Sequence, residues 1–103
     1  MNDKTRTSDS GGRVLRVLKA LRGHSLTGLS NGDLAKALDE SPATINRCMN
    51  TLIAEGLATK LDTGRFALSI AVLQIAQAHA NEMAMAQGRI NEINQRVLAG
   101  ANR

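Results

Sequence analysis

The residues best suited to specific chemistry lie in the stretch 41–56, which is predicted to form a helix with two unlike sides. One side is an apolar stripe at the i, i+4, i+7, i+8 spacing of a buried helix face, made of Ile45, Met49, Leu52 and Ile53. The other side carries a small residue, two amides and a guanidinium, on Ala43, Asn46, Arg47 and Asn50. No carboxylate interrupts this polar side before Glu55. Amides and guanidinium groups hydrogen-bond with base edges and phosphates, so the pattern predicts a recognition helix for double-stranded DNA.

Arg47 is the residue expected to read a base, because its planar fork matches the O6 and N7 acceptors of guanine in the major groove. Two other roles remain open for it. The side chain can contact a phosphate, or it can form an ion pair with Asp33 or Asp39 that holds the helix in place. DNA contact of some kind is favoured over a purely structural role.

The other polar residues of the stretch have narrower expected roles. Asn46 and Asn50 can each pair with adenine through the side-chain amide, although Asn50 can instead touch only the DNA backbone. Ser41 and Thr44 are expected to bond phosphate or to cap the helix.

Short helices before this stretch complete a recognisable pattern. A first helix is expected over 13–22 and a second over 31–38. Ser30 is the expected N-cap of the second helix, with Asp33 at the capping-box position. After a short connection, Pro42 occupies the first position of the third helix, where a missing N–H costs nothing. Two helices joined by about three residues predict a helix-turn-helix.

Residues 57–68 alternate apolar and polar side chains around a loop that contains Gly64, which predicts a β-hairpin. A hairpin directly after a helix-turn-helix is the wing of a winged-helix domain. Lys60 and Arg65 flank its tip and are expected to contact phosphates, and Arg65 can also enter the minor groove. Arg13 and Arg16 of the first helix are weaker candidates of the same kind.

The stretch 69–99 is rich in Ala, Gln and Met and is predicted to form one helix or a helix pair. Two columns of a seven-residue repeat run along it, through Val72, Ala76, His79, Met83, Ala86, Ile90, Ile93 and Val97. Such a seam predicts a homodimer contact, although His79 and the alanines weaken it. The alternative is an amphipathic helix that folds back on the core of its own chain. Dimerisation is favoured over this alternative.

Length, charge and composition limit the kinds of protein that this chain can be. At 103 residues the chain has room for one modest core, and its net charge of +4 mildly favours a polyanionic partner. No apolar run approaches a membrane span and no signal peptide begins the chain, so a cytoplasmic protein, held at the nucleoid by DNA, is expected. We expect a disordered arm over 1–12, a winged helix-turn-helix domain over 13–68 and a disordered end over 100–103.

No enzyme site, metal site or cofactor is predicted. His24 and His79 are far apart and belong to no metal-ligand spacing. Cys48 lies one turn before Leu52 and is expected to be a small core residue rather than a nucleophile. The glycines form no phosphate-binding GxxxxGK[ST] pattern.

The order of these pieces resembles the N-terminal winged-helix domain of IclR-type transcriptional regulators. The segments RVLRVLKAL, LSNGDLAKAL, ATINRCMNTLIAEGL and GRFALSIAVLQIA carry the resemblance, which covers residues 13–76. The resemblance implies sequence-specific DNA binding, usually as a dimer on a pseudo-palindromic site. It also implies that Ala43, Thr44 and Arg47 belong to the recognition helix. Glu40 departs from the family, which commonly has an apolar residue there.

The leading interpretation is a mostly α protein with a small β-hairpin (α+β): a winged helix-turn-helix followed by a C-terminal dimerisation segment. Such a protein is expected to regulate transcription, with repression by occlusion favoured over activation. Two recognition helices related by a two-fold axis would enter major grooves about 34–36 Å apart, which predicts a palindromic site. The chain ends before the effector-binding domain that usually follows in the family, so control by a ligand is not expected from it.

Two rival functions remain open at this stage. One is a DNA-binding module for replication, transposition or packaging. The other is a protein-interaction adaptor whose winged helix does not bind DNA.

Overall fold

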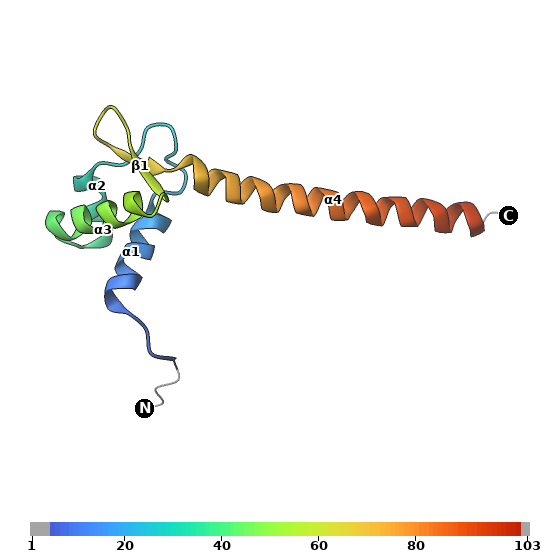
Figure 1. Cartoon of the computed structure of the whole chain (residues 1–103), viewed down its shortest axis with the longest axis horizontal. Coiled ribbons are helices and arrows are strands. Elements are labelled where there is room, and N and C mark those ends of the chain that lie inside the picture. Colours follow the sequence, from blue (N-terminus) through green and yellow to red (C-terminus); the bar gives the residue numbers. More distant parts are fainter. Residues whose placement is uncertain (1–4, 102–103) are drawn as a thin grey trace. The chain divides into compact units, whose positions relative to one another are not determined.

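The computed structural model describes residues 5–101, which are mostly helical with one small antiparallel sheet (Figure 1). The elements follow in the order α1 (Asp9–Ala20), α2 (Asn31–Leu38), α3 (Pro42–Ala54), β1 (Ala58–Lys60), β2 (Phe66–Leu68) and α4 (Ile70–Ala101). This is the order of a winged helix-turn-helix followed by a helical segment, so the predicted fold class is confirmed. The chain divides into two compact units, one ending at Val72 and one beginning at Leu73.

Helix α1 begins earlier than the sequence pattern predicted. Ser8 Oγ accepts a hydrogen bond from the Gly11 amide at 3.0 Å and caps the helix. Asp9 lies in the first turn, where the helix dipole favours an acid. The predicted disordered arm over 1–12 is therefore wrong from Asp9 onward, because the serine cap offsets the low helix propensity of the two glycines. Residues 1–4 lie outside the described part of the chain.

Local caps fix the helix-turn-helix. Ser30 and Asp33 form the predicted capping box, with reciprocal hydrogen bonds of 3.0 and 3.1 Å. Asp39 ends α2 in the left-handed region, at φ 53° and ψ 50°, which aspartate tolerates better than most residues. Asn31 Nδ2 donates to the carbonyl of Pro42 at 3.1 Å and so joins the first turns of α2 and α3.

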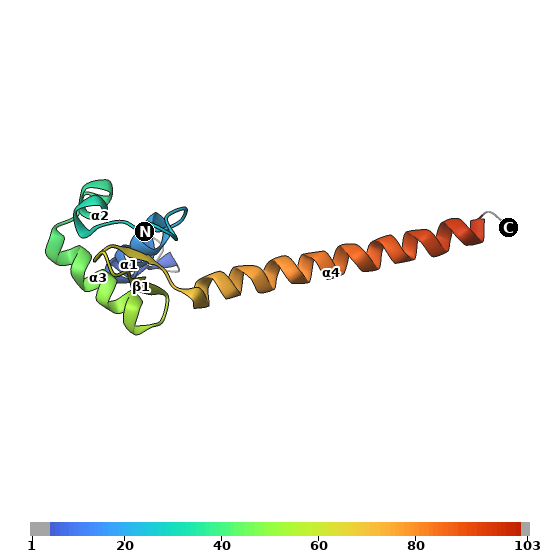
Figure 2. The same cartoon turned by 90° about the horizontal axis from the view of Figure 1, so that it is seen from above.

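The hairpin is anchored to the helices by a third short segment. Strands β1 and β2 pair antiparallel with Lys60 opposite Phe66. Leu29, just before α2, exchanges two backbone hydrogen bonds with Phe66, at 2.8 and 2.7 Å. Gly28 is required beside this bridge, because its φ is 70° and an added Cβ would lie 2.7 Å from the Phe66 carbonyl oxygen. Figure 2 shows α1, α2, α3 and the hairpin gathered together.

An aliphatic core lies among the first three helices and the hairpin. Its fully buried large side chains are Val17, Leu21, Leu34, Ile45, Met49 and Leu52. Cys48 is buried with them, as predicted. The sequence pattern placed Ile53 in the buried stripe, but it is 37% exposed because it lies at the edge of the helix face that packs. In α1, Val17 is buried in the core, whereas Leu15 is 54% exposed.

Helix α4 is one continuous helix in Figure 1, not the pair of helices that the sequence left open. Ser69 begins it, accepting from the Val72 amide and donating to the Gly56 carbonyl at 2.6 Å. Gly88 does not interrupt the helix, which continues to Ala101, so the predicted disordered end is wrong for residues 100 and 101. Residues 102–103 lie outside the described part of the chain. Among the described residues, no helix is long and apolar enough to span a membrane.

Candidate nucleic-acid interface

The exposed side of α3 carries the residues that the sequence pattern selected. Ala43, Asn46, Arg47 and Asn50 are all exposed, whereas Ile45, Cys48, Met49 and Leu52 point into the core. The helix from Pro42 to Ala54 contains no acidic residue. Its exposed side therefore presents hydrogen-bonding groups without a fixed negative charge.

Arg47 is held only loosely by its own chain. Its guanidinium donates to Thr44 Oγ1 at 3.4 Å, which is a long hydrogen bond. Within residues 5–101, no ion pair joins Arg47 to Asp33 or Asp39, the two partners that a structural role would require. The charge on Arg47 is thus available to an outside acceptor.

Ser41 is committed to the helix terminus. Its hydroxyl oxygen accepts from the Thr44 amide at 3.1 Å, and its O–H donates to Thr44 Oγ1 at 2.9 Å. Of the two roles that the sequence left open for Ser41, capping is the one present in the structure. Thr44 receives hydrogen bonds from both Ser41 and Arg47, so it sets the position of the Arg47 side chain.

A cavity of about 210 Å³ opens between α1 and α3. Three hydroxyl groups, two guanidinium groups and two apolar side chains line it, on Ser10, Arg13, Val14, Thr44, Arg47, Cys48 and Thr51. Hydroxyls and guanidinium groups are the side chains that commonly donate to phosphate oxygens. The cavity thus extends the polar side of α3 toward the first helix.

Arg13 also ties α1 to the helix-turn-helix. Its Nε lies 3.2 Å from Glu40 Oε1, and both side chains are partly shielded from solvent. This ion pair gives a physical reason for a charged residue at position 40, where the resemblance led us to expect an apolar one. Because Glu40 neutralises part of the charge of Arg13, the attraction of Arg13 for a phosphate is weaker.

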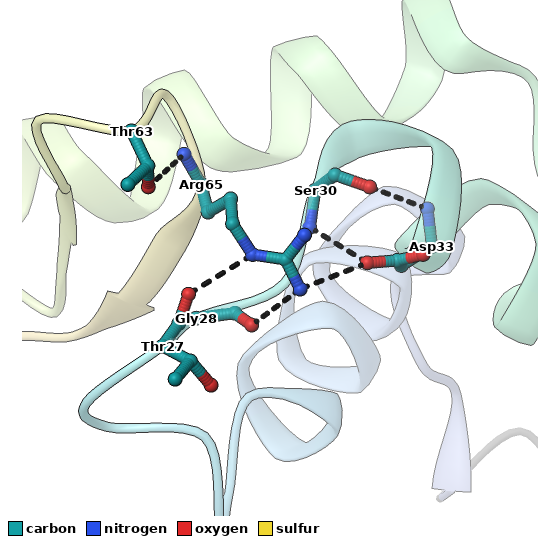
Figure 3. A network of polar contacts seen from close by, with 6 residues as sticks. All are labelled: Thr27, Gly28, Ser30, Asp33, Thr63 and Arg65. Atoms are coloured by element: carbon teal, nitrogen blue, oxygen red, sulfur yellow. Dashed lines mark hydrogen bonds and ion pairs between the residues drawn. The ribbon is translucent and has the colours of Figure 1, made fainter.

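Arg65, predicted to contact DNA from the wing, instead joins the wing to the start of α2 (Figure 3). Its Nε donates to the Thr27 carbonyl at 2.9 Å, and one terminal nitrogen donates to the Gly28 carbonyl at 3.1 Å. The same nitrogen forms an ion pair with Asp33 Oδ2 at 3.3 Å. These bonds engage Nε and one terminal nitrogen, so the geometry gives Arg65 a structural role in holding the wing.

Asp33 receives charge-stabilising contacts from two directions. Hydrogen bonds from the Ser30 amide and then from the Ser30 side chain hold the pKa of Asp33 below its ordinary value of 3.8, and the Arg65 charge lowers the pKa further. The carboxylate is therefore ionised at neutral pH. In this form it caps α2 and, at the same time, pairs with Arg65 of the wing.

Lys60 is the wing residue whose charge remains exposed. Its Nζ lies 6.0 Å from the centroid of the Phe66 ring, at the outer limit of a cation–π contact. No ion pair involves it within residues 5–101. The ring can support the aliphatic stem while the ammonium group stays in solvent.

The predicted dimer residues lie on α4, apart from the residues above. Met83, Ile90, Ile93 and Val97 are between 51% and 63% exposed. Ala76 and Ala86 are exposed and Val72 is half-buried. No residue of α4 is buried.

Ser10 and Thr51 were not selected by the sequence pattern, although both line the cavity between α1 and α3. Ser10 was missed because the two following glycines suggested that the helix begins later. The spacing from Ser8 to Gly11, that of an N-cap to its N3 residue, is the signal that would have found it. Thr51 Oγ1 donates to the Arg47 carbonyl at 3.1 Å, a contact that no sequence motif indicates.

Comparison with known proteins identifies this arrangement. Residues 12–62 match the model of the IclR helix-turn-helix domain. An IclR family transcriptional regulator from Brucella abortus superposes with a TM-score of 0.62 at 21% identity, over 77% of this chain and 30% of that protein. A mutant of S. aureus MepR bound to an oligodeoxyribonucleotide gives a TM-score of 0.53 at 21% identity, over 87% of this chain and 73% of that one. No curated protein sequence matches the chain.

The two kinds of comparison carry different weight. At 21% identity the solved structures establish the fold alone, and this chain spans only 30% of the Brucella protein. The family model adds the type of domain, in agreement with the sequence resemblance. Residues 12–62 therefore form an IclR-type helix-turn-helix domain, and β2 completes the wing that follows it.

Proposed function

We propose that this protein is a sequence-specific DNA-binding transcription regulator that inserts α3 into the major groove. The observation that carries the proposal is Arg47, an arginine on an acid-free exposed helix face with no ion pair among the described residues. Thr44 orients the guanidinium, which can then make the paired hydrogen bonds that guanine accepts. Asn46 and Asn50 supply amides on the same side of the helix, and Ala43 leaves room for the groove wall.

Backbone contacts on either side of α3 would fix its position in the groove. The cavity between α1 and α3 offers the Ser10 hydroxyl beside Arg47, a pair that suits a phosphate oxygen. Lys60 on the wing offers a second, separate phosphate contact. Arg65 contributes indirectly, because its bonds to Thr27, Gly28 and Asp33 hold the wing beside the helix-turn-helix.

We further propose that two copies associate through α4 and bind a pseudo-palindromic site. The support is the seven-residue repeat of α4, a helix with no buried residue. Repression by occlusion is the favoured outcome, because a dimer that covers two half-sites competes with other proteins for that DNA. The MepR structure bound to an oligodeoxyribonucleotide is consistent with DNA binding by this fold.

Binding to fluorescent duplex DNA, measured by anisotropy at several salt concentrations, tests the DNA-binding part of the proposal. We expect saturable binding whose logarithm of affinity falls linearly with the logarithm of salt concentration. Binding should also be stronger on a selected sequence than on a scrambled duplex of the same length. Absence of binding even at low salt would refute the proposal and favour the protein-interaction adaptor.

A further inference from the structure

The exposed repeat of α4 also indicates how the two helices of a dimer are oriented. Each of its two columns contains one alanine among larger side chains. One column reads Ala76, Met83, Ile90 and Val97, and the other reads Val72, His79, Ala86 and Ile93. Because α4 is a continuous helix, these eight residues form one stripe along it. The order of large and small residues decides which orientation of two such helices packs evenly.

Parallel pairing packs this stripe poorly. In a parallel two-stranded coil each seam residue faces its own copy, so Ala76 faces Ala76 and Ala86 faces Ala86. Two layers would therefore be underfilled, and His79 would face a second imidazole in the middle of the seam. Cavities left by such small pairs are destabilising.

Antiparallel pairing removes these mismatches when the two-fold axis passes between residues 84 and 85. Each residue of one column then faces a residue of the other column. Val72 pairs with Val97, Ala76 with Ile93, His79 with Ile90, and Met83 with Ala86. Every alanine meets a large side chain, and all eight seam residues are used. Shifting the register by one heptad in either direction leaves two seam residues unpaired at the ends of each helix.

The charges beside the seam select the same register. Glu82 and Arg89 lie at equivalent flanking positions one heptad apart, both are exposed, and neither has an ion-pair partner among residues 5–101. In the antiparallel register they face each other across the interface twice, once on each side of the two-fold axis. In a parallel pair Glu82 would face Gln87, and Arg89 would face Asn94, so neither charge would be matched. The two shifted antiparallel registers would place Glu82 against Glu82 or Arg89 against Arg89.

We infer that α4 pairs antiparallel with α4 of a second copy, with Ala76 against Ile93 and Glu82 against Arg89. This inference rests on the proposed dimer and adds its orientation and register. Because an α-helix rises 1.5 Å per residue, the two Ile70 residues, where the α4 helices begin, lie about 43 Å apart along the paired axis. The winged units therefore join opposite ends of the paired segment.

Thiol cross-linking of the full-length chain tests the orientation. Ala76→Cys and Ile93→Cys are made separately in a Cys48→Ala background, and a short bismaleimide is added to each variant alone and to their mixture. In the antiparallel dimer the two copies of position 76 lie about 26 Å apart, so neither single variant should cross-link to itself. The mixture should give a covalent heterodimer. Self-cross-linking of either single variant would overturn the inference in favour of a parallel pair.

Charge reversal tests the register by a second route. Glu82→Arg and Arg89→Glu should each raise the dimer dissociation constant about tenfold, because each replaces two exposed ion pairs with two repulsive contacts. The double variant should return close to the original value, since the pairs re-form with their signs exchanged. Failure of the double variant to recover, with its helix content unchanged by circular dichroism, would contradict the pairing of these two residues.

The outcomes separate this inference from the proposed function. If the chain sediments as a monomer at all concentrations, and also binds operator DNA as a monomer, the proposed dimer is wrong. Both proposals that depend on the dimer then fail. A dimer that cross-links through Ala76→Cys alone would leave the proposed regulator intact and overturn only the antiparallel orientation. A trimer or tetramer would overturn the two-helix pairing as well.

Discussion

Arg47 and Arg65 show how the contacts of a guanidinium group decide what it can do. Arg65 makes bonds to two carbonyls and a carboxylate of its own chain, whereas Arg47 makes one long bond to a threonine. The first therefore holds the wing to the start of α2, and the second leaves most of its donors unused among the described residues. Replacing each arginine should consequently affect different properties of the protein.

We predict that Arg47→Ala weakens specific DNA binding by about 1–3 kcal/mol and relaxes the preference at one base pair. The reason is the loss of a forked donor to guanine. Anisotropy titrations on a panel of single-base operator variants would measure both effects. Arg22→Ala, which removes a positive charge at the end of α1, serves as the matched control and should leave the sequence preference unchanged. A binding motif identical to that of the wild type would disprove base reading by Arg47.

We predict that Arg65→Ala lowers the free energy of unfolding by about 1 kcal/mol, because its removal leaves the Thr27 and Gly28 carbonyls without this donor and removes the ion pair to Asp33. Arg65→Lys should recover little of this loss, since a single ammonium group cannot reproduce the fork. Urea denaturation followed by circular dichroism measures the change. Unaltered stability in Arg65→Ala would show that the wing does not depend on this contact.

Lys60→Ala is predicted to weaken DNA binding without lowering stability, in contrast to Arg65→Ala. Because the Lys60 charge is exposed, its loss should leave the unfolding free energy nearly unchanged. DNA affinity should fall about equally on all sequences, and the slope of the salt dependence should become shallower by about one phosphate contact. A changed sequence preference in this variant would contradict a phosphate-contact role.

At the scale of elements, the N-terminus of α2 couples the wing to the helix-turn-helix through one carboxylate. Asp33 caps α2 through Ser30 and binds Arg65 of the wing. Its pKa is lower in the folded protein than the ordinary value of 3.8. The ionised form therefore favours folding, and this contribution is fully present above pH 3.8 and is lost as the pH falls through the lowered pKa.

Thermal unfolding of the wild type and of Asp33→Asn across a pH series checks this coupling. We expect the wild type to be the more stable protein near neutral pH. The two midpoints should converge as the pH falls through the lowered pKa of Asp33, where the carboxyl of the folded protein becomes protonated. A difference that stays constant down to the lowest pH would show that the charge of Asp33 does not stabilise the fold.

The elements also show what the sequence can and cannot predict. Caps and periodicity are local, so α2, α3, the capping box at Ser30 and the burial of Cys48 followed from residue spacing alone. The start of α1 did not, because one serine cap outweighs two glycines. The role of Arg65 could not be predicted either, since its partners Thr27 and Asp33 lie more than thirty residues away in the chain.

At the scale of the whole molecule, α4 is the helix that we propose joins two winged units. We predict that Ile93→Glu raises the dimer dissociation constant at least about a hundredfold, because it buries a charge opposite Ala76, which offers no partner for it. Gln95→Glu, an equal change of charge on the outer side of α4, is the matched control and should have little effect. Sedimentation equilibrium measures the constants. Equal behaviour of the two variants would show that the seam is not the interface.

The measurement that tests the central claim most directly is selection of bound sequences from random double-stranded DNA with the full-length protein. The account predicts enrichment of one motif, made of two inverted half-sites separated by a whole number of helical turns. The same selection with Arg47→Ala should recover that motif with one base-pair position relaxed in each half-site. A selection that enriches no motif, despite a folded dimeric protein, would contradict the claim that α3 reads DNA sequence.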